Sequence, residues 1–113
     1  MVDAKVLEAI NFFSTSVKKN GIHIHDLILF GSSSAGTARP DSDIDIAIIS
    51  NDFAGRNIFE RAIMTKDAEI QTIRKFKIPL DVLTLTPEEY QDQTSLIAGT
   101  IRKGIVLPTI SSA

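Results

Sequence analysis

The sequence predicts an α/β fold in which a small mixed β-sheet packs against helices. Two short, continuous apolar runs, at residues 27–30 and 44–49, have the length and composition of buried strands. A third apolar run covers residues 80–85, and stretches with the spacing of amphipathic helices alternate with the strands. The chain has 113 residues, which is enough for one domain with a modest core and too few for two.

The N-terminal stretch predicts a helix over about residues 3–20. Asp3 is a suitable N-cap, lysines occupy the last turn, and Gly21 is a natural stop. Phe12 falls off the inner stripe of this helix. That stripe has helical spacing and consists of Val6, Leu7, Ile10, Phe13 and Val17.

The first two strands are expected to be antiparallel. Only 12 residues separate Phe30 from Asp43, and a full crossover helix does not fit in that length. We expect this segment to be a loop, with one short helical turn near residues 33–38.

A second long helix is predicted from Ile58 to Lys75, before the strand that follows Pro79. Its charged residues are assigned to the solvent face. The apolar spacing assigns seven residues to the inner face, namely Ile58, Phe59, Ala62, Ile63, Ile70, Ile73 and Phe76.

The last helix has a clear start. Thr86 can cap it, Pro87 suits the first turn, and Glu89 completes a capping box. The helix, with a break near Thr94, is expected to end at Gly104, and Tyr90 is expected to pack within it.

The chain is expected to form one domain over residues 1–107. Residues 105–107 predict a short edge strand, and residues 108–113 a flexible tail.

The composition excludes several classes of protein. It is 43% hydrophobic and 23% charged, which is ordinary for a globular chain. A formal charge of −2 disfavours general nucleic-acid binding. No apolar run approaches the roughly 20 residues of a membrane span, and the start does not resemble a signal peptide. The absence of cysteine excludes disulfides and thiolate metal sites, and we expect a cytoplasmic protein.

Two carboxylates open the second strand, with only Ile44 between them. Because residues i and i+2 of a strand point to the same face, Asp43 and Asp45 should project together. Such a pair repels unless a proton or a cation lies between the carboxylates. Oxygen ligands of this kind suit Mg²⁺, which also binds substrate phosphates.

A third acid, Asp81, lies within the apolar strand 80–85, where an unpaired carboxylate is costly. If this strand lies beside the second, Asp81 can face the same site. The alternatives are that Asp43 is only a strand-start residue, and that Asp81 pairs with Lys77 or Arg102.

The loop before these acids has features of a phosphate-binding segment. Gly31 lets the backbone approach an anion closely, and the Ser32 hydroxyl and the following N–H groups can donate to phosphate oxygens. Gly36 permits a further bend. The segment lacks the Gly-Lys-Ser/Thr of a Walker loop.

Taken together, "FGSSSAGTARPDSDIDIAII" resembles the signature of the DNA polymerase β-type nucleotidyltransferase superfamily. In that signature an apolar residue and Gly-Ser precede, by about ten residues, an Asp-x-Asp in an apolar strand, and a third acid follows on a later strand. Ten residues separate Ser32 from Asp43 here. Ser42 matches the serine before the first aspartate. Over about residues 4–107 the chain is similar to the minimal, single-domain members.

The resemblance implies a nucleotidyltransferase fold and a site with two Mg²⁺ ions and ATP or another nucleoside triphosphate. Gly31 and Ser32, with Gly36 and Ser42 nearby, would bind the triphosphate. The metal ligands would be Asp43, Asp45 and Asp81, and Asp81 would also help to deprotonate an acceptor hydroxyl.

The loop departs from the family in one respect. Relatives commonly carry an arginine just before the second glycine, where this chain has Ala35. Arg39 or Arg56 would have to supply the positive charge instead.

Two functions remain open. In the first, the chain transfers AMP from MgATP to a hydroxyl presented by a homodimer mate or by another protein. The small members resemble antitoxins that modify a tyrosine of a helical HEPN-type partner. In the second, the chain is a weak or inactive enzyme that neutralises a helical partner by contact. His23 and His25 form a further i, i+2 pair, for which an exposed strand edge is favoured over a metal site.

Overall fold

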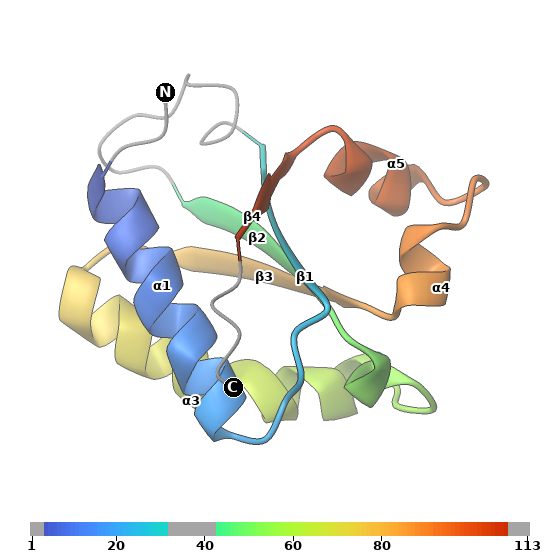
Figure 1. Cartoon of the computed structure of the whole chain (residues 1–113). Coiled ribbons are helices and arrows are strands. Elements are labelled where there is room, and N and C mark those ends of the chain that lie inside the picture. Colours follow the sequence, from blue (N-terminus) through green and yellow to red (C-terminus); the bar gives the residue numbers. More distant parts are fainter. Residues whose placement is uncertain (1–3, 32–42, 109–113) are drawn as a thin grey trace.

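The computed structural model describes residues 4–31 and 43–108 (Figure 1). The elements are, in order, α1 (Ala4–Lys19), β1 (Asp26–Phe30), β2 (Ile44–Ile49), η1 (Asn51–Phe53), α3 (Ile58–Phe76), β3 (Leu80–Leu85), α4 (Pro87–Tyr90), α5 (Leu96–Arg102) and β4 (Ile105–Leu107). This order confirms the predicted α/β fold and each predicted strand. No helix in the described part of the chain is long and apolar enough to cross a membrane.

The four strands form one mixed sheet in the order β3-β2-β1-β4. The antiparallel pairing of β1 with β2 confirms the prediction. β3 lies beside β2 and runs parallel to it, while β4 pairs antiparallel with β1 at the other edge. The ends of three strands therefore meet in one row, where Phe30 is opposite Asp45 and Asp45 is opposite Asp81.

Helices cover the two faces of the sheet separately, as Figure 1 shows. α1 and α3 cover the face that carries Ile44, Ile46 and Ile48 of β2, and they form the larger core. The opposite face carries Ala47 and Ile49 of β2, and α5 packs on it. Strand alternation puts Asp45 on this second face, the one that α3 does not cover.

The helix boundaries agree with most of the predicted signals. Thr86 caps α4 in a capping box with Glu89, and the predicted break falls between α4 and α5. Tyr90 packs against the smaller core, as expected. Asp3 and the turn expected near residues 33–38 lie outside the described residues.

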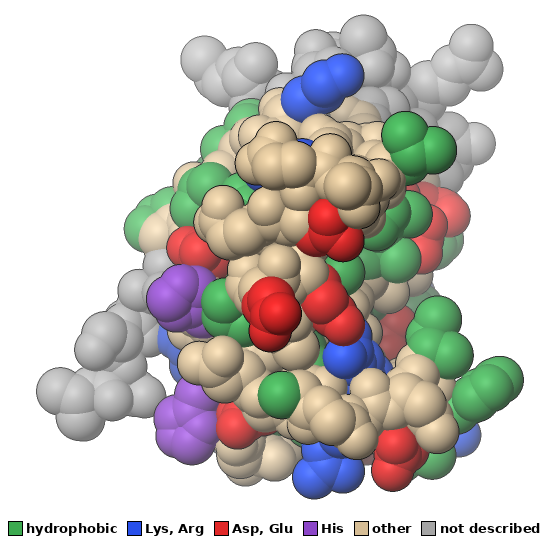
Figure 2. Space-filling view, turned by 90° about the vertical axis from the view of Figure 1, so that its right-hand side faces the viewer, with side chains coloured by type: hydrophobic (Ala, Val, Ile, Leu, Met, Phe, Trp, Pro, Cys, Tyr) green, Lys and Arg blue, Asp and Glu red, His purple; other side chains and the backbone are tan. Residues whose placement is uncertain are grey.

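The inner face predicted for α3 is wrong. The fully buried residues of this helix are Thr65, Ala68 and Thr72, which are small enough to let the helix lie close to the sheet. Of the predicted inner residues, Ile73 and Phe76 are half-buried, and the other five are exposed. Figure 2, which views the molecule from the side of α4 and α5, shows hydrophobic side chains standing out at its right-hand border.

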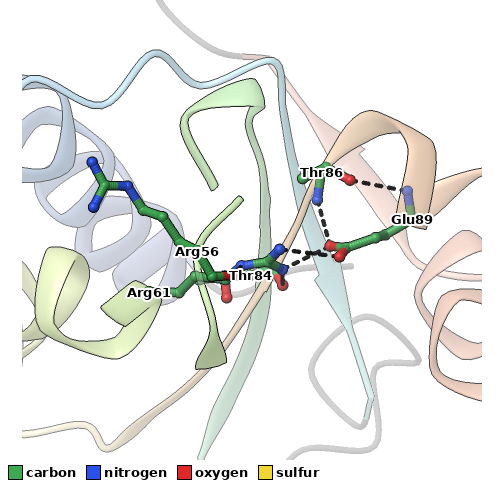
Figure 3. A network of polar contacts seen from close by, with 5 residues as sticks. All are labelled: Arg56, Arg61, Thr84, Thr86 and Glu89. Carbon is green, nitrogen blue, oxygen red and sulfur yellow. Dashed lines mark hydrogen bonds and ion pairs between the residues drawn. The ribbon is translucent and has the colours of Figure 1, made fainter. Parts of the chain in front are cut away.

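A network of hydrogen bonds connects α3 with the end of β3 and with α4 (Figure 3). Arg61 donates to both carboxylate oxygens of Glu89, at 2.7 and 3.0 Å, and also to the carbonyl oxygen of Thr84. Glu89 in turn accepts from the backbone N–H of Thr86. The side chain of Arg61 is only 12% exposed, so this bidentate pair satisfies a cation that is largely out of water.

Replacing Glu89 with Gln should destabilise the fold by about 1 kcal/mol at neutral pH. Gln still completes a capping box, so the variant removes only the charge pair. The pKa of Glu89 lies below its ordinary value of 4.5, and the hydrogen bond from Arg61 is the largest cause. Stability from the pair is therefore present above 4.5 and is lost as the pH falls through the lowered pKa. Urea unfolding should show a deficit for the variant that shrinks in acid, whereas Glu88→Gln, at an exposed neighbour, should show none. A deficit that grew in acid would contradict this account.

Candidate active site

The fold brings the three predicted acids to one end of the sheet. Asp43 directly precedes β2, Asp45 is its second residue, and Asp81 is the second residue of β3. The register places Asp45 opposite Asp81, and in parallel strands such residues point to the same face. The condition on which Asp81 was assigned to this site, that its strand lies beside the second, is fulfilled.

The alternative pairing of Asp81 is not found. Within the described residues no ion pair joins Asp81 to Lys77 or Arg102. Arg102 instead donates to the backbone carbonyls of Tyr90 and Asp92.

Asp45 is the electrostatic centre of the group. The pKa of Asp45 is raised above its ordinary value, and burial of the carboxyl group is the largest cause. The charges of Asp81 and Asp43 and a hydrogen bond between the Asp45 and Asp81 carboxyl groups add to the effect. The carboxylates are thus close enough to repel one another. A cation or a shared proton relieves such repulsion.

The backbone of Gly31 lies against the Asp45 carboxylate. It has φ +72°, and a Cβ added there would lie 2.2 Å from Oδ2 of Asp45. No side chain fits in that space, so the glycine lets the backbone that follows β1 lie directly against the Asp45 carboxylate at residue 31. The residue predicted to bind phosphate therefore contacts the predicted metal ligand.

Glu69 is a further acid that the sequence did not indicate, because it was assigned to the solvent face of its helix. It is half-buried on α3 and accepts a hydrogen bond from Thr65 at 3.0 Å. Burial raises its pKa, and the charge of Asp81 adds to the effect. Its charge thus adds to the negative potential around Asp81, which attracts cations.

Arg56 does not lie at the acids. It precedes α3, beyond the far end of β2, and it lines a hollow with Asn20, Asp52 and Met64. The length of a six-residue strand, about 20 Å, separates the two ends. Its proposed role in reaching the phosphates is therefore wrong. Arg39 lies outside the described residues, as do Ala35 and the remaining loop residues assigned to phosphate, Ser32, Gly36 and Ser42.

The two histidines do not form a shared site. Nδ1 of His23 lies 3.2 Å from Asp52, and Nε2 of His25 lies 3.8 Å from Asp26.

The donor set at the acid site has the chemistry that Mg²⁺ requires, since carboxylate oxygens are its usual protein ligands. In residues 4–31 and 43–108, however, no three histidine, cysteine or carboxylate side chains are grouped tightly enough to form a ready metal site. The three carboxylates therefore match a magnesium ion in the kind of oxygen donor they offer, while their side chains are not drawn together around one point.

Comparison with known families agrees with this arrangement. The model of the nucleotidyltransferase domain family matches residues 10–106. The chain belongs to this family. No curated protein matches the chain. The family match begins within α1, ends within β4 and includes all three acids of the site.

Solved structures of nucleotidyltransferases share its fold. One, a protein assigned as a nucleotidyltransferase from Sulfolobus solfataricus, has a TM-score of 0.60 and 17% identity. The match covers 100% of this chain and 94% of that one. Another is a toxin–antitoxin structure with AMP-PNP, with a TM-score of 0.60 and 17% identity. That match covers 89% of this chain and 74% of the other.

Proposed function

We propose that this nucleotidyltransferase domain transfers AMP from MgATP to a hydroxyl group of a partner protein. The observation that carries the proposal is the row formed by Gly31, Asp45 and Asp81: the Gly31 backbone lies against the Asp45 carboxylate, and Asp45 is opposite Asp81 across the two strands. This is the combination that phosphoryl transfer requires, because its catalysis consists mostly of positioning and charge neutralisation.

The chain's own residues have distinct tasks in this reaction. Gly31, which has no side chain to displace the Asp45 carboxylate, would bind the triphosphate through its backbone. Asp43, Asp45 and Asp81 would hold Mg²⁺. The metal, when bound, supplies charge neutralisation at the reacting oxygens. The acceptor oxygen forms a bond to the α-phosphorus while the bond from that phosphorus to the bridging oxygen breaks, and pyrophosphate leaves. Asp81, which is exposed, takes the hydroxyl proton.

We assign the acceptor to a second protein, namely a tyrosine of a helical HEPN-type partner in a cytoplasmic toxin–antitoxin pair. The described helices pack on the sheet of this domain or on each other, so none of them forms a separate acceptor domain. The structural neighbour with AMP-PNP, which is a toxin–antitoxin structure, supports this choice.

Calorimetric titration of ATP with and without Mg²⁺ tests the nucleotide site. We expect binding that depends on Mg²⁺ and that Asp43→Asn loses, because the variant removes one charge from the metal site. The matched control is Asp26→Asn, which changes an aspartate at the other end of the sheet and should leave binding intact. If no nucleoside triphosphate bound to the chain or to its complex with the partner, the chain would be a binding module that neutralises its partner by contact.

A further inference from the structure

β3 is an edge strand, and part of its outer edge is open next to the acid site. In the described part of the chain β2 pairs with it on one side and no strand pairs with it on the other. The carbonyls of Pro79 and Leu85 both accept hydrogen bonds, at 2.9 Å, from N–H groups of β2 and of the residue that follows it. Because backbone groups alternate in direction along a strand, those of Leu80 and Val82 point away from β2.

The open backbone groups lie on either side of Asp81. No described residue forms a hydrogen bond with the outward N–H and C=O groups of Leu80 and Val82. Further along the strand, the carbonyl of Thr84 accepts from Arg61, as Figure 3 shows. Unpaired groups at a sheet edge are a template for another strand, so an extended segment can pair with β3 directly beside Asp81.

A hollow of about 500 Å³ follows the same edge. Its lining includes Ala62, Thr65 and Glu69 of α3, residues 82–85 of β3 and Ile97 of α5. β3 is half-buried at five of its six residues, whereas β1 and β2 each have only one residue that is not buried. The hollow thus has walls on both faces of the sheet, and it can receive the side chains of an added strand, which alternate between the two faces.

Glu69 gives this hollow a negative charge that no cation balances. Its Oε2 accepts from Thr65 at 3.0 Å, and within the described residues it forms no ion pair. The charge of Asp81 acts on it, which places the two carboxylates near one another. The other acid of the hollow, Glu89, is already paired with Arg61. A half-buried, unpaired carboxylate in a binding groove favours a basic side chain on the ligand.

Strand alternation assigns neighbouring side chains of an added segment to the two acids. Asp81 lies on the face of the sheet that α5 covers, together with Leu83 and Leu85, and Glu69 belongs to the helix on the opposite face. A hydroxyl residue beside Asp81 therefore has its neighbour in sequence on the side of Glu69.

We propose that the acceptor hydroxyl arrives on an extended segment of the partner protein, outside that protein's helices. The segment pairs with β3 and carries a lysine or arginine next to the acceptor residue. This inference rests on the proposed function, to which it adds how the acceptor is recognised.

Two short blocked peptides test the preference for a basic side chain. Both have the sequence Val-Val-X-Tyr-Val, and X is lysine in one and glutamate in the other. In NMR titrations without nucleotide, the lysine peptide should bind about tenfold more tightly, because glutamate would meet the charge of Glu69. Glu69→Lys should reverse this preference. The matched control is Asp67→Lys, the same change at an exposed acid about 200° around the same helix, which should keep it.

Amide hydrogen exchange tests the pairing with β3. In the free chain the outward N–H groups of Leu80 and Val82 should exchange faster than those of Asp81 and Leu83, which face β2. With the lysine peptide at saturation, Leu80 and Val82 should become protected.

Three results would overturn the proposal. The first is that neither peptide binds at millimolar concentration, the second is that both bind equally, and the third is binding that leaves exchange at Leu80 and Val82 unchanged. Since these measurements use no nucleotide, any of the three would leave the proposed transfer of AMP standing. A chain that binds the lysine peptide along β3 and transfers no AMP would confirm the groove and contradict the proposed function.

Discussion

Asp45→Asn is expected to lower nucleotidyl transfer by about a thousandfold. Asp45 is the central acid of the site. Asp43 lies two residues before it in the chain, and Asp81 lies opposite it on the neighbouring strand. The amide keeps the shape of the side chain but removes the charge that balances a magnesium ion. Pyrophosphate release in the presence of MgATP and the acceptor protein measures the loss.

The same variant should be more heat-stable than the wild type in metal-free buffer. Burial and the charges of Asp81 and Asp43 raise the pKa of Asp45, so the ionised side chain costs stability at neutral pH. Mg²⁺ should stabilise the wild type and have little effect on the variant. Asp26→Asn should preserve activity. Full activity in Asp45→Asn would show that this row of acids is not the catalytic centre.

Gly31→Ala is the second substitution with a large expected effect. The new Cβ would lie 2.2 Å from Oδ2 of Asp45, and the residue would have to keep a φ of +72°. The backbone strain alone costs about 1–2 kcal/mol. The clash must in addition displace the Asp45 carboxylate, so we expect a strong loss of transfer together with the loss of stability measured by urea unfolding.

Gly55→Ala separates these two effects. Gly55 has a φ of +74°, and nothing lies within 4 Å of an added Cβ, so this variant carries the strain without the clash. It should lose a similar amount of stability and keep its activity. In an Asp45→Ala background, Gly31→Ala should cost less stability than it does in the wild type. Equal activity in Gly31→Ala and Gly55→Ala would contradict the role given to the contact with Asp45.

The sequence predicted the strands, because the apolar runs that form them are local. The shared face of Asp43 and Asp45 stays a prediction from strand alternation, since β2 begins only at Ile44. The alignment of Asp45 with Asp81 depends on the pairing of two strands that are far apart in the sequence. The sequence could therefore place Asp81 at the site only on the condition that these strands are neighbours. The capping box at Thr86 was predictable since its hydrogen bonds span only three residues.

The orientation of α3 could not be read from its hydrophobic pattern. Periodicity identifies the most apolar face of a helix, and this face ordinarily lies on the chain's own core. Here the sheet accepts Thr65, Ala68 and Thr72, and the face with Ile63 and Ile70 is left outside. The same assumption placed Glu69 in solvent, although it is half-buried near the charge of Asp81.

Intact-protein mass spectrometry of the proposed helical HEPN-type partner tests the central claim most directly. After incubation with this chain and MgATP, we predict a gain of one adenylyl group on a tyrosine, and no gain with Asp45→Asn. Neutralisation of that protein without any change in its mass would contradict the claim.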